Sequence, residues 1–443
     1  MTTGNELQEL LHDAIRAHDV PGAAVAVGHD GKLTEAAAGV LNRDTGVRAT
    51  PDSLFQIGSV TKVWTAALVL QLVDEGRVDL DEPVRRYLPE FAVADQEATE
   101  TVTVRNLLTH TAGFEGDLFE DTGRGDDALE RYLAYLAEAA GQVHPVGALY
   151  SYSNSGFAVA GALVARLRGT LWETALRDRL ITPLGVTHMA LLPEEAILFR
   201  ASAGHDHRGD IYREWLLPRS LGPAGSAPSA APRELVRFGR ALLSPKNGPI
   251  SADAVAAMTT AQVSIPGVPG RTADRYGLGI ALFDWNGTPV IGHDGGTIGQ
   301  STLWRVVPGH DLVVAMTANG GEADAVFDTL LDRIIKDATG VTVPPRPAPS
   351  GTPAGPGPER FAGSYAYGLN RYDVAVADEG LDVTVTAQGV AAENGVPPAT
   401  MRCVPLTGDT FVTSEPFEGA YRTITFVGDG RFLHDGRAAP RLA

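Results

Sequence analysis

The first part of the chain changes from a helical to a strand-like hydrophobic period. Residues 6–19 predict an amphipathic helix whose apolar stripe consists of Leu7, Leu10, Leu11, Ala14 and Ile15. Residues 21–40 then predict a β-hairpin, because apolar runs flank the turn residues Asp30 and Gly31. A strongly apolar helix is expected over residues 63–72. The chain therefore begins with mixed helix and strand structure.

The middle of the chain predicts a helical region enclosed by strands. Residues 80–270 are expected to form mainly helical pieces joined by long polar loops. Strand patterns return at residues 276–283, 289–291, 301–307 and 311–317, and a helix pattern follows at 324–336. Because strands stand at both ends of this region, we expect one α/β sheet closed by its two ends, with a helical insertion.

The composition changes near the C-terminal end. Residues 344–358 are rich in Pro, Gly, Ser and Ala, which is typical of a semi-stiff linker. Beyond residue 361, short alternating runs between turn residues predict a small antiparallel β-barrel or sandwich. We therefore expect an α/β domain at residues 1–340, a linker at 341–360, and a β-domain, as a lipocalin-like barrel, at 361–443.

Composition also limits the partners. The 443 residues are 44% hydrophobic and 20% charged, the balance of a globular protein with a large core. The net charge is −18 and no basic run is present, so nucleic acid and anionic membranes are poor partners. No signal peptide or membrane-length apolar run is visible, so we expect a cytoplasmic protein without membrane contact.

Neither a metal nor a cofactor is expected. Cys403 is the only cysteine, which excludes an internal disulfide and a cysteine-based metal cluster. His205 and His207 flank an aspartate, but their polar, glycine-rich surroundings are typical of a loop. Residues 295–299 lack the Lys-Ser/Thr of a phosphate-binding loop, and no Gly-x-Ser-x-Gly elbow is present.

The first candidate for chemistry is a serine followed three positions later by a lysine. The chain has only four lysines, and Ser59 and Lys62 form its only Ser-x-x-Lys pair. Side chains at these positions of a helix share one face, and a desolvated lysine can act as a base where arginine cannot. Such a pair can form an acyl-enzyme. A helix-capping serine beside a solvated lysine is the alternative, which the apolar neighbours Val60 and Val63 argue against.

A second motif, Tyr152-Ser-Asn154, lies just before an apolar helix expected over residues 156–167. A tyrosine near the Ser–Lys pair can carry a proton to a leaving group. The asparagine points to the same side in an extended segment and can hydrogen-bond a substrate amide. For an isolated Tyr-x-Asn, a polar loop with a helix N-cap remains the simpler explanation.

The tripeptide His-Asp-Gly occurs three times. The copies at His29 and His434 lie between strand-like runs and are explained as hairpin turns. At His293 the motif continues into further glycines, which is unusual for a simple turn. Gly295 and Gly296 would let a substrate backbone lie against an edge strand, and the N–H of Gly296 could serve an oxyanion hole.

In this order the motifs resemble those of the serine β-lactamase/penicillin-binding-protein superfamily. They occur together with Leu-Leu-Thr-His-Thr-Ala-Gly at residues 107–113, and the resemblance covers about residues 8–340. The branch it favours contains class C β-lactamases, D-Ala-D-Ala carboxypeptidases and related esterases. It implies an antiparallel sheet flanked by helices, with a helical subdomain.

The resemblance also implies roles for the motif residues. Ser59 would be the nucleophile, Lys62 and Tyr152 its proton-transfer partners, and Asn154 the group that holds the substrate amide. The oxyanion hole would consist of the backbone N–H groups of Ser59 and Gly296. A histidine stands in the third motif, at position 293, where many relatives carry lysine, which is similar to the carboxypeptidase branch and argues against efficient antibiotic hydrolysis.

A chain of this family with no visible export signal and a C-terminal β-domain resembles the penicillin-binding-protein-type thioesterases of actinomycetes. That resemblance implies release, often as a macrocycle, of a nonribosomal peptidyl thioester with a D-residue at the acyl end, carried on a carrier-protein domain. The alternatives are a cytosolic D-stereoselective peptidase, amidase or esterase and, in another class, a penicillin-binding sensor or scaffold that acylates without turnover. Arg437 could place a cation near a substrate carboxylate, with a solvated surface arginine as the alternative.

Overall fold

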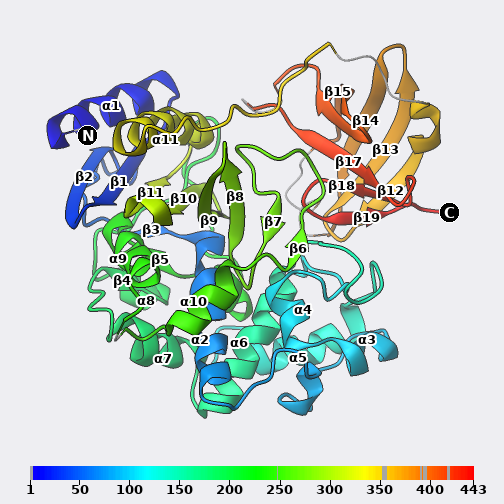
Figure 1. Ribbon diagram of the computed structural model, residues 1–443, viewed down its shortest axis with the longest axis horizontal. Helices are drawn as coiled ribbons and strands as arrows, with labels where there is room; N and C mark the ends of the chain where they lie inside the picture. Colours follow the sequence, from blue (N-terminus) through cyan, green and yellow to red (C-terminus); the bar gives the residue numbers. More distant parts are fainter. Residues whose placement is uncertain (1–2, 247, 352–356, 390–391, 393–396, 417–419) are drawn as a thin grey trace.

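The end of the chain forms a separate β-structure beside a larger α/β unit (Figure 1). The computed structural model describes all residues except 1–2, 247, 352–356, 390–391, 393–396 and 417–419. In Figure 1 the large sheet lies between α1 and α11 on one side and the helical region on the other. The barrel lies beside the β6 end of this sheet.

The large sheet has eight antiparallel strands in the order β2-β1-β11-β10-β9-β8-β7-β6. The hairpin from the start of the chain pairs with a strand from the far end of the region, with Ala26 of β1 opposite Ala315 of β11. This pairing confirms the expected sheet closed by its two ends. The strands are β1 (Gly22–His29), β2 (Lys32–Gly39), β6 (Val263–Ser264), β7 (Arg275–Tyr276), β8 (Ala281–Trp285), β9 (Thr288–Thr297), β10 (Gln300–Val307) and β11 (Leu312–Ala318).

Helices cover both faces of this sheet (Figure 1). On one face, α1 (Gly4–Ala17) and α11 (Ala323–Thr339) share a core with alternate residues of β11 such as Val314. On the other, α9 (Pro232–Leu243) shares a core with the residues between them, such as Val313. Because successive strand residues point to opposite faces, a strand buried on both faces is apolar throughout.

The segment between β2 and β6 forms the helical region, as expected. Its two most buried helices, α2 (Thr61–Asp74) and α6 (Asn154–Arg168), pack against each other, which explains why neither shows a polar face in the sequence. The others are α3 (Gln96–Thr101), α4 (Val104–Leu108), α5 (Ala128–Ala139), α7 (Trp172–Leu176), α8 (Pro193–Ala196) and α10 (Ala252–Thr259), and a small sheet joins β3 (Phe55–Gln56), β5 (Ser229–Ala230) and β4 (Met189–Ala190). Among the described helices, none has the length and apolar character needed to cross a membrane.

Two strand predictions near the site need correction. The strand expected over residues 276–283 is interrupted between β7 and β8, because the N–H of Gly279 turns away to the Leu108 carbonyl at 2.8 Å. A Cβ at Gly279 would lie 2.3 Å from the Cβ of Ala66, so this loop packs directly on α2. The strand expected at 289–291 is longer, since β9 continues to Thr297 and includes His293.

The C-terminal part is a nearly closed antiparallel barrel, which decides between the barrel and the sandwich. Eight strands follow in chain order, and the first and last meet through a bridge between Tyr365 and Arg441. Cys403 lies buried in the barrel core. The strands are β12 (Gly363–Tyr367), β13 (Asn370–Ala377), β14 (Gly380–Ala387), β15 (Ala399–Thr407), β16 (Thr410–Thr413), β17 (Thr423–Val427), β18 (Phe432–His434) and β19 (Ala438–Pro440). We keep the division at residues 340 and 361 as a proposal.

Candidate active site

Ser59 lies in a tight turn directly before α2. The turn starts at Gly58, whose φ of +50° is disfavoured for other residues, and residues 58–60 form one 3-10 turn that leads into the helix. The backbone of β9 lies against this turn, since a Cβ at Gly295 would be 2.0 Å from the Ile57 carbonyl oxygen and 3.3 Å from the Ser59 nitrogen. The serine is therefore held between the helix N-terminus and the glycines of the third motif.

Lys62 is fully buried and its amine contacts three oxygen atoms. Nζ lies 2.9 Å from Ser59 Oγ, 2.7 Å from Asn154 Oδ1 and 2.7 Å from the Ala224 carbonyl oxygen. Burial lowers the pKa of Lys62 well below its ordinary value, because the charged form loses its hydration. A neutral amine fits these contacts: it donates its two hydrogens to Asn154 and Ala224 and presents its lone pair to the hydroxyl of Ser59.

Tyr152 lies beside this pair, as the motif predicted. The Lys62 amine lies 4.8 Å from the centre of the Tyr152 ring. Burial raises the pKa of Tyr152 above its ordinary value, and a hydrogen bond with the Ser59 hydroxyl opposes this. Tyr152 is therefore a phenol at neutral pH, able to give a proton and not to take one from Ser59. Burial thus lowers the pKa of the base, Lys62, and raises the pKa of the acid, Tyr152.

Asn154 stands at the first turn of α6. Ser153 caps this helix, because its Oγ accepts the Gly156 N–H at 2.9 Å. The amide Nδ2 of Asn154 donates to Asp117 Oδ1 at 2.6 Å, while its oxygen faces Lys62. Since a carboxylate only accepts hydrogen bonds, Asp117 sets which end of the Asn154 amide points toward the lysine.

His293 is the end of a buried chain of hydrogen bonds. The Ser153 N–H donates to Nδ1 of His110 at 3.0 Å, so Nε2 of His110 carries the hydrogen that faces Tyr276 Oη at 3.2 Å. The Tyr276 hydroxyl in turn lies 3.1 Å from His293 Nε2, and Nδ1 of His293 faces the Asp294 carbonyl at 2.6 Å. Burial lowers the pKa of His293 to about 4, and the nearby Lys62 acts in the same direction. The ring is thus neutral and held in one orientation.

The outer half of β9 is open on one side. β8 pairs with β9 only between Thr288 and Gly292, whereas β10 pairs along residues 291–297. Gly296 lies in the half of β9 that β8 leaves unpaired, and a Cβ there would meet open space. The predicted edge strand is therefore present as a half-strand, which leaves backbone groups free to bind an extended peptide.

These groups line one cavity of about 790 Å³. All eight residues singled out from the sequence contribute to the site, and seven of them line this cavity: Ser59, Tyr152, Asn154, His293, Gly295, Gly296 and Arg437. Lys62 is buried and does not line the cavity, but its amine contacts Ser59. The two other His-Asp-Gly copies form hairpin turns, as predicted, between β1 and β2 and between β18 and β19.

The pair formed by His205 and His207 shows no sign of a metal site. Nδ1 of His205 faces the Asn319 carbonyl at 2.7 Å and its Nε2 accepts the Arg43 N–H at 3.2 Å, so both ring nitrogens tie loops together. No group of three or more metal-ligating side chains occurs among the residues that the structure describes.

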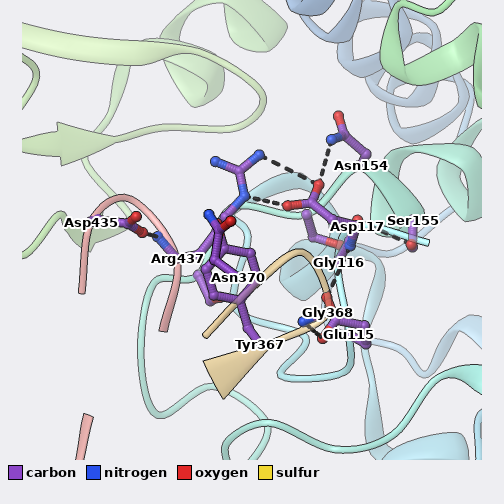
Figure 2. A network of polar contacts seen from close by, with 12 residues as sticks. Glu115, Gly116, Asp117, Asn154, Ser155, Tyr367, Gly368, Asn370, Asp435 and Arg437 are labelled. Carbon is purple, nitrogen blue, oxygen red and sulfur yellow. Dashed lines mark hydrogen bonds and ion pairs between the residues drawn. The ribbon is translucent and has the colours of Figure 1, made fainter. Parts of the chain in front are cut away.

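Sequence reasoning missed the residues that support the motifs from outside. Asp117 and Tyr276 are not in any of the three motifs, and Asp117 pairs with Arg437 across 320 positions of the chain (Figure 2). His110 lies in the segment 107–113 that carried the resemblance, but nothing in its sequence context indicated contact with Tyr276. Arg437 reaches the site from the turn between β18 and β19, which decides against a freely solvated arginine.

A family model described as Beta-lactamase matches residues 7–338. The chain belongs to the β-lactamase family. Penicillin-binding protein 4 of Amycolatopsis lactamdurans is 44% identical over 366 residues, which cover 80% of this chain and 95% of that protein. Members of this family are serine hydrolases, and the Ser59–Lys62 contact is the arrangement that such chemistry needs.

The likeness to solved structures extends beyond the α/β region. The crystal structure of SurE has a TM-score of 0.80 and 29% identity over 99% of both chains, and that of SurE with D-Leu has a TM-score of 0.77 at the same identity and coverage. D-amino acid amidase from Ochrobactrum anthropi SV3 has a TM-score of 0.63 at 24% identity, over 75% of this chain and 98% of its own, and shows the fold alone.

Proposed function

We propose that this protein is a penicillin-binding-protein-type thioesterase. It releases a nonribosomal peptidyl thioester with a D-residue at the acyl end, and it closes the product into a ring. The observation that carries this proposal is the likeness to SurE over 99% of both chains, barrel included, together with the D-Leu in one of those structures. The donor is a peptidyl thioester on a carrier-protein domain or on a small thiol.

In this proposal the first half-reaction forms an ester on Ser59. The neutral amine of Lys62 takes the proton of Ser59 Oγ, which lies 2.9 Å away, as Oγ attacks the thioester carbonyl carbon. The N–H groups of Ser59 and Gly296 stabilise the oxyanion. The carbon–sulfur bond then breaks, and the proton on Lys62 passes through Tyr152 to the leaving sulfur.

The second half-reaction transfers the acyl group to an amine. The N-terminal amine of the same peptide attacks the ester carbonyl and a carbon–nitrogen bond forms. The bond between the carbonyl carbon and Ser59 Oγ then breaks, and the amine proton passes through the same groups to Oγ. A cavity of about 790 Å³ has the size of a site for a folded small ligand. His293, which burial keeps neutral and Tyr276 contacts, adds no charge beside the incoming amine.

Arg437 takes part in substrate binding in this proposal. Its Nε and Nη2 face Asp117, and its guanidinium carbon lies 4.9 Å from the Tyr152 ring centre. Arg437 also lines the cavity. A carboxylate or peptide end of the substrate is the group that this guanidinium suits.

A D-stereoselective peptidase, amidase or esterase is the second candidate. It is favoured by the 44% identity to a penicillin-binding protein over most of both chains. In both candidates Ser59 attacks a carbonyl carbon and forms an ester. The leaving group is a thiol in the first candidate and an amine or alcohol in the second, and water replaces the amine as the acceptor in the second.

Product analysis separates the two candidates. We would incubate the protein with a linear peptidyl N-acetylcysteamine thioester ending in a D-residue. The products would be separated by liquid chromatography and their masses measured by mass spectrometry. We expect a product lighter than the free acid by one water, formed faster than from the matched peptide ending in an L-residue, and no product with Ser59→Ala. Free acid alone would contradict the cyclase and support the hydrolase.

A further inference from the structure

The barrel contacts the catalytic segment directly through two of its turns. In the β18–β19 turn, the Gly436 carbonyl accepts the Tyr152 N–H at 3.0 Å. Nε2 of His434, the last residue of β18, faces the Tyr150 carbonyl at 2.9 Å. In the β12–β13 turn, the Gly368 N–H donates to Glu115 Oε2 at 2.8 Å. These contacts fix the barrel against the backbone that carries Tyr152. Figure 2 shows the contact between Gly368 and Glu115.

Asp117 is the point where this contact reaches the catalytic residues. Only 1% of its side chain is exposed, and it accepts from Asn154 on one side and from Arg437 on the other. Asn154 links the carboxylate to the amine of Lys62, since its two amide atoms contact one partner each. Among the described residues, Asp117 forms its ion pair with Arg437 alone.

The charges on Asp117 and Arg437 act on Lys62 in opposite directions. The Asp117 carboxylate raises the pKa of Lys62 and the Arg437 guanidinium lowers it, while burial is the largest cause of the net decrease. Without the Arg437 guanidinium, the effect of the Asp117 carboxylate on Lys62 would not be offset, and it would favour the charged form of that amine.

The other titratable groups that face Lys62 carry no charge at neutral pH. Burial raises the pKa of Tyr152, and it lowers the pKa of both His110 and His293. Two further acidic groups lie near the Asp117–Arg437 pair. Burial raises the pKa of Glu115, and Asp435 of the barrel faces Arg437. The charge balance at the lysine therefore depends mainly on Asp117 and Arg437.

We propose that the barrel keeps the catalytic base active: Arg437 neutralises the buried carboxylate of Asp117, and Lys62 is thereby left unprotonated to accept the proton of Ser59. Arg437 and Asp117 are positioning residues in this step, since they act through Asn154 and through their charges. Undocking the barrel would remove the guanidinium and stop acylation at neutral pH. The inference rests on the proposed roles of Ser59 and Lys62.

The test is the pH dependence of Ser59 acylation by p-nitrophenyl acetate. This ester has no carboxylate, so its reaction is independent of any role of Arg437 in substrate binding. For Arg437→Gln we expect the acidic limb of the profile to move to higher pH, with a rate about tenfold lower at pH 7 that recovers in alkaline buffer. For Asp117→Asn the limb moves to lower pH, and the double variant returns it close to the native position.

The matched control is Arg402→Gln, which removes an exposed guanidinium paired with Asp382 on the same barrel and leaves the profile unchanged. A rate loss in Arg437→Gln that is equal at every pH would overturn the inference, because it would indicate a structural role alone. If Arg437→Gln does not fold, the shift of Asp117→Asn to lower pH decides the matter in the same way. Failure of the native protein to acylate Ser59 would overturn the proposed function as well.

Discussion

Replacing Tyr276 by phenylalanine tests the buried chain of hydrogen bonds that holds His293. Tyr276 is 1% exposed, and its hydroxyl lies 3.2 Å from His110 Nε2 and 3.1 Å from His293 Nε2. Phenylalanine fills the same space but leaves a ring N–H of His110 and a ring nitrogen of His293 without a partner. Each unsatisfied buried group costs about 1–3 kcal/mol, so the loss of both partners should lower the free energy of unfolding by about 2–6 kcal/mol.

Urea unfolding followed by tryptophan fluorescence measures this loss of stability in the α/β region that contains Tyr276. All five tryptophans, at positions 64, 172, 215, 285 and 304, precede the barrel. The control is Tyr87→Phe, which removes a hydroxyl that accepts only the exposed Asp79 N–H, and it should change the free energy of unfolding by less than about 0.5 kcal/mol. If Tyr276→Phe is no more damaging than Tyr87→Phe, the hydroxyl does not link the histidines.

Three further predictions concern the site. Because burial lowers the pKa of Lys62, acylation of Ser59 should persist at neutral pH and disappear only as the pH falls through that lowered value. Lys62→Arg stays protonated and should lower the acylation rate by a factor of about 10²–10⁴. A native rate in this variant would contradict the role of Lys62 as the base. Gly295→Ala places a Cβ 2.0 Å from a carbonyl oxygen and should cost about 1–3 kcal/mol, whereas Gly296→Ala meets open space; equal melting temperatures would refute the close approach. Arg437→Ala should raise KM more for substrates with a free carboxylate than for their amides, and equal kinetics on both would end that role.

Much of the site was predictable because its chemistry is written in short motifs. Ser59 and Lys62 are one helical turn apart, so their contact follows from local geometry alone. Tyr152 and Asn154 are adjacent to a helix start that the sequence marks with an apolar run. The hairpin turns at His29 and His434 follow from the same kind of local rule, and the alternating runs beyond residue 361 predicted a small antiparallel barrel or sandwich.

The residues that tune the site were not predictable, because their partners are distant in sequence. Nothing near Asp117 indicates that a barrel turn brings Arg437 to it. The break between β7 and β8 depends on the approach of α2 to Gly279, which a strand pattern does not contain. β9 is longer than its apolar run, because its glycine-rich half pairs with β10 and faces a cavity instead of the core.

The most direct test of the account is to trap the acyl-enzyme and locate it. After brief incubation with a peptidyl thioester ending in a D-residue and rapid acid quenching, trypsin should release the peptide of residues 49–62, which contains Ser59 and ends at Lys62. The account predicts the mass of the acyl group on this peptide, with fragment ions that place it on Ser59, and no such adduct in Ser59→Ala. An adduct on another residue, or turnover without any adduct on Ser59, would contradict the central claim.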